Sequence, residues 1–214
     1  SILKKIIFYA LPFVLIDVLN SAYGMVDTLT VVNTMSKLGY STAVAEKAIG
    51  VLTTWGTKLN TIVAAIAIGV STSLIPNIAS ANVKKTLRKL GVAPEALNRK
   101  VNQSLQALIV TTLPMVSGLF FLATPVWVIF YGYDAMSIDI FKWFIIPSIT
   151  FSFFTILIDI MQTLNESKIT LGTLFGSFLA KAIMNIPLMM LFVKIGIEAF
   201  YAPIFATFLT QGVS

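Results

Sequence analysis

The chain has 214 residues, of which 57% are hydrophobic and only 11% are charged, and its net charge is +6. Soluble domains carry about 25% charged residues, so this composition excludes an ordinary soluble core and indicates an integral membrane protein. Cysteine and histidine are absent and no polar basic surface accompanies the aromatic residues, so we expect neither an enzyme, a metal site, a cofactor nor nucleic-acid binding.

Six apolar runs are each long enough to cross a bilayer, because about 20 apolar residues span its hydrocarbon core. They predict membrane-spanning helices at residues 6–32, 48–80, 105–131, 138–164, 169–193 and 197–214. The runs are continuous rather than alternating, so a β-barrel is not expected. Every run contains proline, which kinks helices and is typical of transporters that bend. The predicted fold is therefore all-α, with residues 1–214 forming a single six-helix transmembrane domain.

The two ends of the chain resemble neither a signal peptide nor natural termini. Lys4 and Lys5 precede the first apolar run as in a signal peptide, but the run continues past Tyr23 without a cleavage site. We therefore predict a true membrane span. The chain begins at Ser1 and its last apolar run stops at Ser214 without a charged flank, so we expect a piece of a longer protein.

Basic residues are concentrated in the connections on one side of the predicted helices. The N-terminus, the basic segment 83–102 and the turn after the fourth run hold nine of them: Lys4, Lys5, Lys84, Lys85, Arg88, Lys89, Arg99, Lys100 and Lys168. Four lysines on the other side are balanced by four acids. The positive-inside rule then places both chain ends in the cytoplasm. We expect segment 83–102 to be a cytoplasmic loop with a short amphipathic helix near lipid headgroups.

Five charged residues fall inside the predicted spans: Asp17, Asp27, Lys58, Asp159 and Lys181. A charge within the membrane is costly, so each indicates a partner or a polar cavity. In two sequential antiparallel spans, Asp17 lies 15 residues from residue 32 and Lys58 lies ten residues from residue 48, or about 22 Å and about 15 Å along the axis from the same side. A pair between Asp17 and Lys58 is therefore geometrically feasible.

Polar side chains accompany Lys58 in the second span. Thr57 and Thr61 share its helical face, and Thr54 extends the same stripe. A polar stripe on an otherwise apolar helix indicates a lumen on that side.

Lys181 and Asn185 are four residues apart and share a helical face in the fifth span, whereas Asp159 and Gln162 share one in the fourth. An interhelical hydrogen bond or snorkelling explains any one of these residues equally well. Lys58 and Lys181 together favour a cavity in which a fixed cation attracts an anionic headgroup such as a diphosphate.

The candidate site residues form two sets. The substrate-binding candidates are Lys58, Lys181, Asn185, Thr57, Thr61 and Gln162, and the candidates for ion coupling are Asp17, Asp27 and Asp159. No nucleophile–base pair, metal-ligand cluster or phosphate-binding loop accompanies either set in the sequence.

Short segments spread over nearly the whole chain resemble, in order, the seventh to eleventh helices of bacterial lipid II flippases of the polysaccharide-exporter type. These segments are Leu11–Leu15 with Tyr23–Thr28, Ser73–Ser80, Leu113–Pro125 with Tyr131 and Gly132, Ile158–Gln162, and Lys181–Asn185. Their order and spacing are most similar to the Firmicutes-type branch. The resemblance implies a MATE-like fold in which two six-helix lobes form a V around a central cavity, with this chain as the C-terminal lobe.

The resemblance also implies a function, in which the lobe moves lipid-linked cell-wall precursor (lipid II) across the bacterial cytoplasmic membrane by alternating access. The implied partners are a lipid-linked diphosphate saccharide, the lipid bilayer and the N-terminal lobe of the same transporter. Lys58 lies on the helix where the family places a cavity cation, but a lysine binds diphosphate as a point charge rather than as the bidentate fork of an arginine. Asp17 departs from the family pattern.

Three alternatives to lipid II transport stay open at this point. They are export of another lipid-linked oligosaccharide, multidrug/cation antiport within the same superfamily, and a membrane scaffold that transports nothing. An antiporter would favour an acid-dominated cavity, whereas the charges within these spans are mixed. Membrane potential, Na+ or H+ would each supply a driving force, with the ions bound at an acid such as Asp17.

Overall fold

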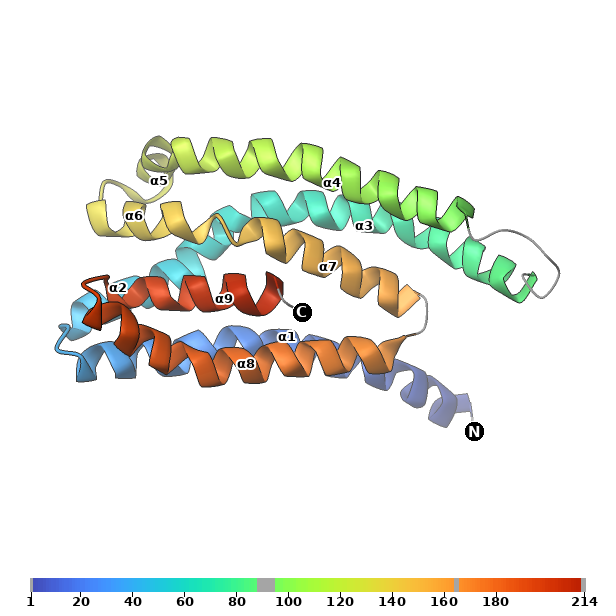
Figure 1. Ribbon diagram of the computed structural model, residues 1–214, viewed down its shortest axis with the longest axis horizontal. Coiled ribbons are helices and arrows are strands. Elements are labelled where there is room, and N and C mark those ends of the chain that lie inside the picture. Colours follow the sequence, from blue (N-terminus) through green and yellow to red (C-terminus); the bar gives the residue numbers. More distant parts are fainter. Residues whose placement is uncertain (1, 88–94, 164–165, 213–214) are drawn as a thin grey trace.

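The computed structural model describes residues 2–87, 95–163 and 166–212, and all regular elements within these ranges are helical (Figure 1). The first half comprises α1 (Ile2–Lys37), α2 (Thr42–Gly50), the π-helical turn η1 (Val51–Trp55), α3 (Gly56–Leu87) and α4 (Glu95–Phe121). The second half comprises α5 (Ala123–Tyr131), α6 (Ala135–Phe144), α7 (Ser148–Thr163), α8 (Ser167–Lys194), the 3-10 turn η3 (Ala199–Tyr201) and α9 (Ala202–Gly212).

The helices form two layers (Figure 1). In one layer α3 packs against both α4 and α7, and in the other α1 packs along α8. The shorter helix α9 contacts α7 and α8 and so joins the two layers. The start of α1, the end of α3 and the start of α4 lie toward the same end of the bundle, as the predicted topology requires. The assignment of that end to the cytoplasm stays a prediction.

Among the described residues, four helical segments are long and apolar enough to cross a membrane: Val14–Lys37, Thr42–Val70, Val101–Phe121 and Ser167–Lys194. A fifth candidate is the pair formed by α6 and α7, which bends by 41°. Pro147 lies in this break and lacks the N–H that a continuous helix would use. Each of the first five predicted runs therefore overlaps a helical segment or bent helix pair that is a candidate span, with different boundaries.

Two predicted spans differ from the structure. The run at 105–131 is divided at Leu122, because Pro125 cannot donate to the Phe121 carbonyl and its ring crowds that group. The run at 197–214 contains the 3-10 turn and then α9, of which the structure describes 11 residues. The sixth span is thus not among the candidates in the described ranges.

The predicted basic loop at 83–102 is shorter than expected. Helix α3 continues to Leu87 and α4 already begins at Glu95, so helix enters the segment from both sides. The remainder, residues 88–94, lies outside the described residues, and so does the predicted amphipathic helix there.

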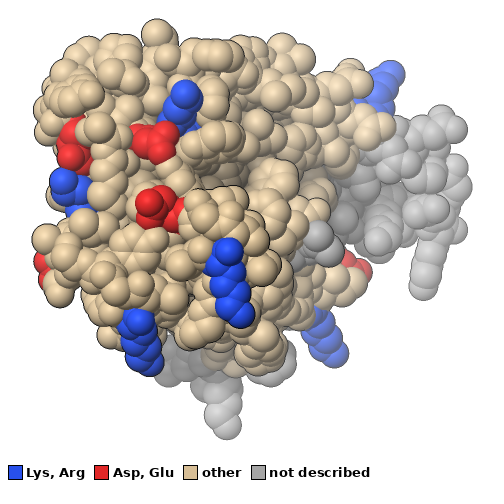
Figure 2. Space-filling view, turned by 60° about the vertical axis from the view of Figure 1, so that its left-hand side comes forward, with Lys and Arg blue, Asp and Glu red and all other residues tan. Residues whose placement is uncertain are grey.

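The largest buried core lies at the end of the bundle that contains α2, η1, α5, α6 and η3. Trp127 and Phe141 are its largest fully buried side chains, and Met35, Val51 and Ile145 pack with them. Figure 2 shows acidic and basic side chains interspersed on the face that includes this end. Lys47 of α2 and Asp134, which precedes α6, form an ion pair of 2.9 Å. This packed end anchors the longer helices on which the polar residues are carried.

Candidate functional site

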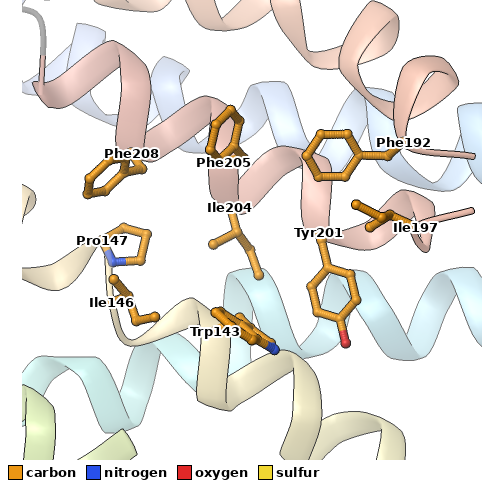
Figure 3. Close-up of a pocket in the computed structure, with 9 residues that line it drawn as sticks. All are labelled: Trp143, Ile146, Pro147, Phe192, Ile197, Tyr201, Ile204, Phe205 and Phe208. Atoms are coloured by element: carbon orange, nitrogen blue, oxygen red, sulfur yellow. The ribbon is translucent and has the colours of Figure 1, made fainter. Parts of the chain in front are cut away.

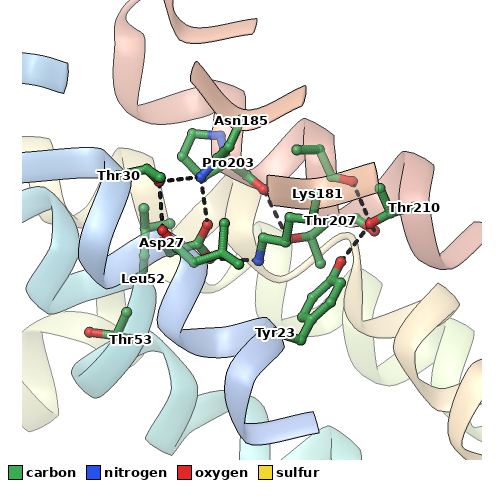
Figure 4. Close-up of polar contacts among 12 residues, drawn as sticks. Tyr23, Asp27, Thr30, Leu52, Thr53, Lys181, Asn185, Pro203, Thr207 and Thr210 are labelled. Carbon is green, nitrogen blue, oxygen red and sulfur yellow. Dashed lines mark hydrogen bonds and ion pairs between the residues drawn. The ribbon is translucent and has the colours of Figure 1, made fainter. Parts of the chain in front are cut away.

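A buried ion pair connects α1 to α8 (Figure 4). Lys181 Nζ lies 2.7 Å from Asp27 Oδ2, and Asn185 Nδ2 donates to Asp27 Oδ1 at 3.1 Å and to Thr30 Oγ1 at 2.6 Å. The Lys181 side chain is 2% exposed and that of Asp27 is 13% exposed. Asp27 and Thr30 are three residues apart on α1, and Lys181 and Asn185 are four apart on α8. Each pair therefore shares the face of its helix that meets the other helix. The structure thus unites three of the residues predicted from sequence.

The tyrosine at position 23 extends this network to α9. Lys181 Nζ lies 4.2 Å from the centroid of the Tyr23 ring, within the range of a cation–π contact. The Tyr23 hydroxyl and Thr210 Oγ1 are 2.6 Å apart, so three helices share one polar cluster (Figure 4). We name Tyr23, Asp27, Thr30, Lys181, Asn185 and Thr210 the buried polar cluster.

The geometry of the buried polar cluster restricts what Asp27 can do. Both of its carboxylate oxygens already accept hydrogen bonds, one from an ammonium and one from an amide. A mobile cation would have to displace Lys181 to reach Oδ2. Burying two opposite charges is costly, and it is balanced only when each charge keeps its partner. The pair is therefore suited to holding α1 against α8 as a neutral unit.

A polar cavity of about 540 Å³ lies beside the buried polar cluster, between α1, α7, α8 and α9. Asp17 of α1 lines it together with Asp159 and Gln162 of α7, and Tyr23 forms part of its wall. The structure therefore gathers two predicted coupling residues and one predicted substrate residue in a single cavity. Carboxylates and amides there could accept hydrogen bonds or hold a hydrated cation.

The third predicted group, Thr57, Lys58 and Thr61, occupies an exposed face of α3. The Thr57 hydroxyl donates to the Leu52 carbonyl at 3.1 Å, and the Thr61 hydroxyl donates to the Thr57 carbonyl at 3.0 Å. The feasible pair between Lys58 and Asp17 is not formed. The ion pairs among the described residues instead join Lys181 to Asp27 and Lys47 to Asp134.

Sequence reasoning missed Tyr23, Thr30 and Thr210 as members of the buried polar cluster. Tyr23 stands four residues before Asp27 and Thr30 three residues after it, so a shared helical face was a signal available in the sequence. Thr210 had no such signal, since only the packing of α9 against α8 brings it to Tyr23.

A separate apolar cavity of about 480 Å³ lies between α6, the end of α8 and α9 (Figure 3). Trp143, Phe192 and Phe205 are among the side chains that point into it. Its lining is suited to hydrocarbon and offers little to a charged headgroup.

The long apolar helices and the charges sequestered among them define a multi-pass helical membrane protein. Its sequence is 28% identical over 196 residues to lipid II flippase MurJ of Bacillus subtilis (strain 168), which confirms the predicted resemblance to lipid II flippases. The alignment covers 88% of this chain but 35% of that protein, so the chain spans about a third of the length of the curated relative. No family model matches the chain. No solved structure matches it either.

Proposed function

We propose that the chain forms one lobe of a MATE-like flippase that moves lipid-linked cell-wall precursor, lipid II, across the bacterial cytoplasmic membrane by alternating access. Two observations support the proposal: the distant similarity to a lipid II flippase, and the exposure of Lys58 on α3. The second observation carries the argument for a substrate-binding face.

Lys58 lies near the middle of a candidate membrane span. It stands two residues from the midpoint of the 29-residue segment Thr42–Val70, or about 3 Å along the helix axis. From that depth a lysine stem is too short to bring its ammonium to either membrane surface. An ammonium facing lipid at the bilayer centre costs about 2.5–3.5 kcal/mol even on the lowest scales. The Lys58 face of α3 is therefore expected to border a polar space rather than lipid.

The chemistry of this face fits an anionic headgroup. Lys58 offers a fixed positive charge, and the hydroxyls of Thr57 and Thr61 lie on the same face of α3. An ammonium binds a diphosphate as a point charge, and a low-dielectric cavity strengthens that attraction. In this proposal a second lobe supplies the opposite wall of the cavity, and the lipid tail stays in the bilayer.

The other predicted residues take supporting roles in the proposal. The buried pair of Asp27 and Lys181 holds α1 and α8 together as the lobe rocks, because its charges are already satisfied within the lobe. Asp17 and Asp159 line the polar cavity, and in this proposal they are the carboxylates that couple transport to Na+ or H+. Membrane potential is the third source of driving force.

Replacing Lys58 tests the proposed substrate face. We expect Lys58→Ala to reduce lipid II translocation by about tenfold or more, since a hydrogen bond to a charged group contributes about 1.5–3 kcal/mol. Lys194→Ala is the matched control, because Lys194 is an exposed lysine in the last turn of α8 and should leave transport unchanged. Translocation is measured by the access of an external lipid II-cleaving reagent in cells that depend on this protein.

Each alternative function predicts a different result in the same cells. Unchanged lipid II translocation in Lys58→Ala, with normal membrane insertion, would contradict the cationic substrate face. Loss of efflux of a cationic drug, with lipid II translocation intact, would indicate an antiporter. Loss of growth with translocation intact would indicate a scaffold. Loss of a different lipid-linked oligosaccharide at the cell surface would indicate an exporter of that compound.

A further inference from the structure

A π-helical turn interrupts the continuous helix just before the proposed substrate face. Helix α2 runs directly into Val51–Trp55, where the Gly56 N–H donates to the Val51 carbonyl, five residues back. The Thr57 hydroxyl also bonds five residues back, to the Leu52 carbonyl. Turns of this kind are rare within α-helices, and they occur frequently at functional sites.

Gly56 is required by the geometry of this turn. A Cβ atom at position 56 would lie 2.6 Å from the Val51 carbonyl oxygen and 3.1 Å from the Phe144 ring of α6. The phenyl ring could shift by a few tenths of an ångström. The carbonyl oxygen belongs to the backbone of the turn itself, so it can move away only if the turn changes its hydrogen bonding. Any residue other than glycine therefore opposes the π-helical form.

Tyr131 supports the turn from the end of α5. Its hydroxyl donates to the Trp55 carbonyl at 3.3 Å, and the rings of Tyr131 and Trp55 lie 6.3 Å apart. Tyr131 thus bonds to a carbonyl at the last position of the π turn. Gly56 permits the π-helical form, and Tyr131 adds a contact from a neighbouring helix that favours it.

The turn sets the direction in which α3 presents its side chains. A π turn holds one residue more than an α turn, and each residue of an α-helix advances the chain by about 100°. Ala45 and Ala48 fix α2 in the core, while Leu59 and Val63 are buried on α3. Conversion of the turn to regular α-helix would rotate α3 relative to α2 by about 100° and carry Lys58 away from its present face.

We propose that Gly56 and Tyr131 are positioning residues, which hold the π turn and thereby direct Lys58 into the transport cavity. This role rests on the proposed function of Lys58, but the geometry is tested separately. The chain contains no cysteine, so single cysteines at Lys58, Leu59, Thr61 and Val63 report which face of α3 is accessible. A small water-soluble maleimide, applied to the protein in native membranes, is the probe.

In the unmodified background, cysteines at 58 and 61 should react at least about tenfold faster than those at 59 and 63, which react only through local opening. Gly56→Ala should reverse this contrast between 58 and 59, and Tyr131→Phe should weaken it. Gly69→Ala is the matched control on the same helix, because a Cβ there meets no atom within 4 Å. It should leave the labelling pattern unchanged.

A rescue variant separates positioning from misfolding. Deleting Thr54 in the Gly56→Ala background removes the surplus residue, so the turn can become α-helical while α3 keeps its face. Restored labelling at position 58 supports the proposal, even if Gly56→Ala alone is too unstable to read. An unchanged pattern in Gly56→Ala, or no recovery after the deletion, overturns it. A rotated pattern with full lipid II translocation would support the positioning role and contradict the proposed function of Lys58.

Discussion

The ion pair between Asp27 and Lys181 should be strongly coupled in the folded protein, because the Lys181 side chain is 2% exposed and that of Asp27 only 13%. Asp27→Asn leaves the ammonium without its counterion, and Lys181→Met leaves the carboxylate with only the amide of Asn185. Breaking a buried pair from one side costs about 3–5 kcal/mol. The double variant removes both charges and retains only the cost of altered hydrogen bonds, about 1–3 kcal/mol. The coupling energy should therefore reach at least about 3 kcal/mol.

A double-mutant cycle measures this coupling. The free energy of unfolding is determined for the parent, both single variants and the double variant by titration with sodium dodecyl sulfate in mixed micelles. The control cycle uses Lys47→Met and Asp134→Asn, whose pair has a similar distance, 2.9 Å, but side chains that are 43% and 35% exposed. Exposed pairs couple by about 0.2–1 kcal/mol, so the two cycles should differ clearly.

The comparison between the two cycles also defines the result that would refute the reasoning. If the Asp27–Lys181 coupling were no larger than that of the control cycle, burial would not be what makes this pair important. The same conclusion would follow if the double variant were as unstable as the sum of the two single variants. In either case the inference that the pair holds α1 against α8 would be wrong.

Two further predictions concern the packed end of the bundle. A hydrogen bond from the Ser137 hydroxyl, and then the ammonium of Lys47, lower the pKa of Asp134 in the folded protein. The stability that Asp134 contributes is therefore present above its unfolded pKa of about 3.9 and is lost as the pH falls through its lower, folded pKa. Thermal unfolding from neutral pH to about pH 2 should show this loss, and Asp134→Asn should remove it. Trp127→Ala should destabilise the protein by about 3–5 kcal/mol, because Trp127 is 1% exposed in the core. Phe130 is 61% exposed, so Phe130→Ala should cost less than about 1 kcal/mol in the same unfolding assay.

The helices could be predicted from sequence because apolar runs of bilayer length leave the backbone little alternative to internal hydrogen bonding. The positions at which these helices break were harder to predict from sequence. Helices break at Leu122, three residues before Pro125, and at Pro147, while Pro76, Pro114 and Pro187 lie inside helices. A proline removes one hydrogen bond in every case, and tertiary packing decides whether the helix continues past it.

The candidate site was predicted as a set of residues but not as an arrangement. Counting residues along a span gives only an approximate depth, and on that basis a pair between Lys58 and Asp17 was feasible. Pairing depends in addition on the direction of each side chain around its helix, which changes by about 100° with every residue. The extra residue in the turn Val51–Trp55 alters that direction for the whole of α3. No local sequence pattern predicted this π-helical turn.

The two intramembrane lysines therefore differ in electrostatic role, although both stand in apolar segments of the sequence. The charge of Lys181 is neutralised within the lobe by Asp27, so it adds no net charge at membrane depth. Lys58 lies on an exposed face of the lobe, near the midpoint of its span. The ion pairs among the described residues do not include Lys58. In the proposed function its counter-charge comes from a bound anionic headgroup or from another part of the protein. In the proposed function an anion that arrives and leaves during transport satisfies this requirement only transiently, so the environment of Lys58 should then change most between the two access states.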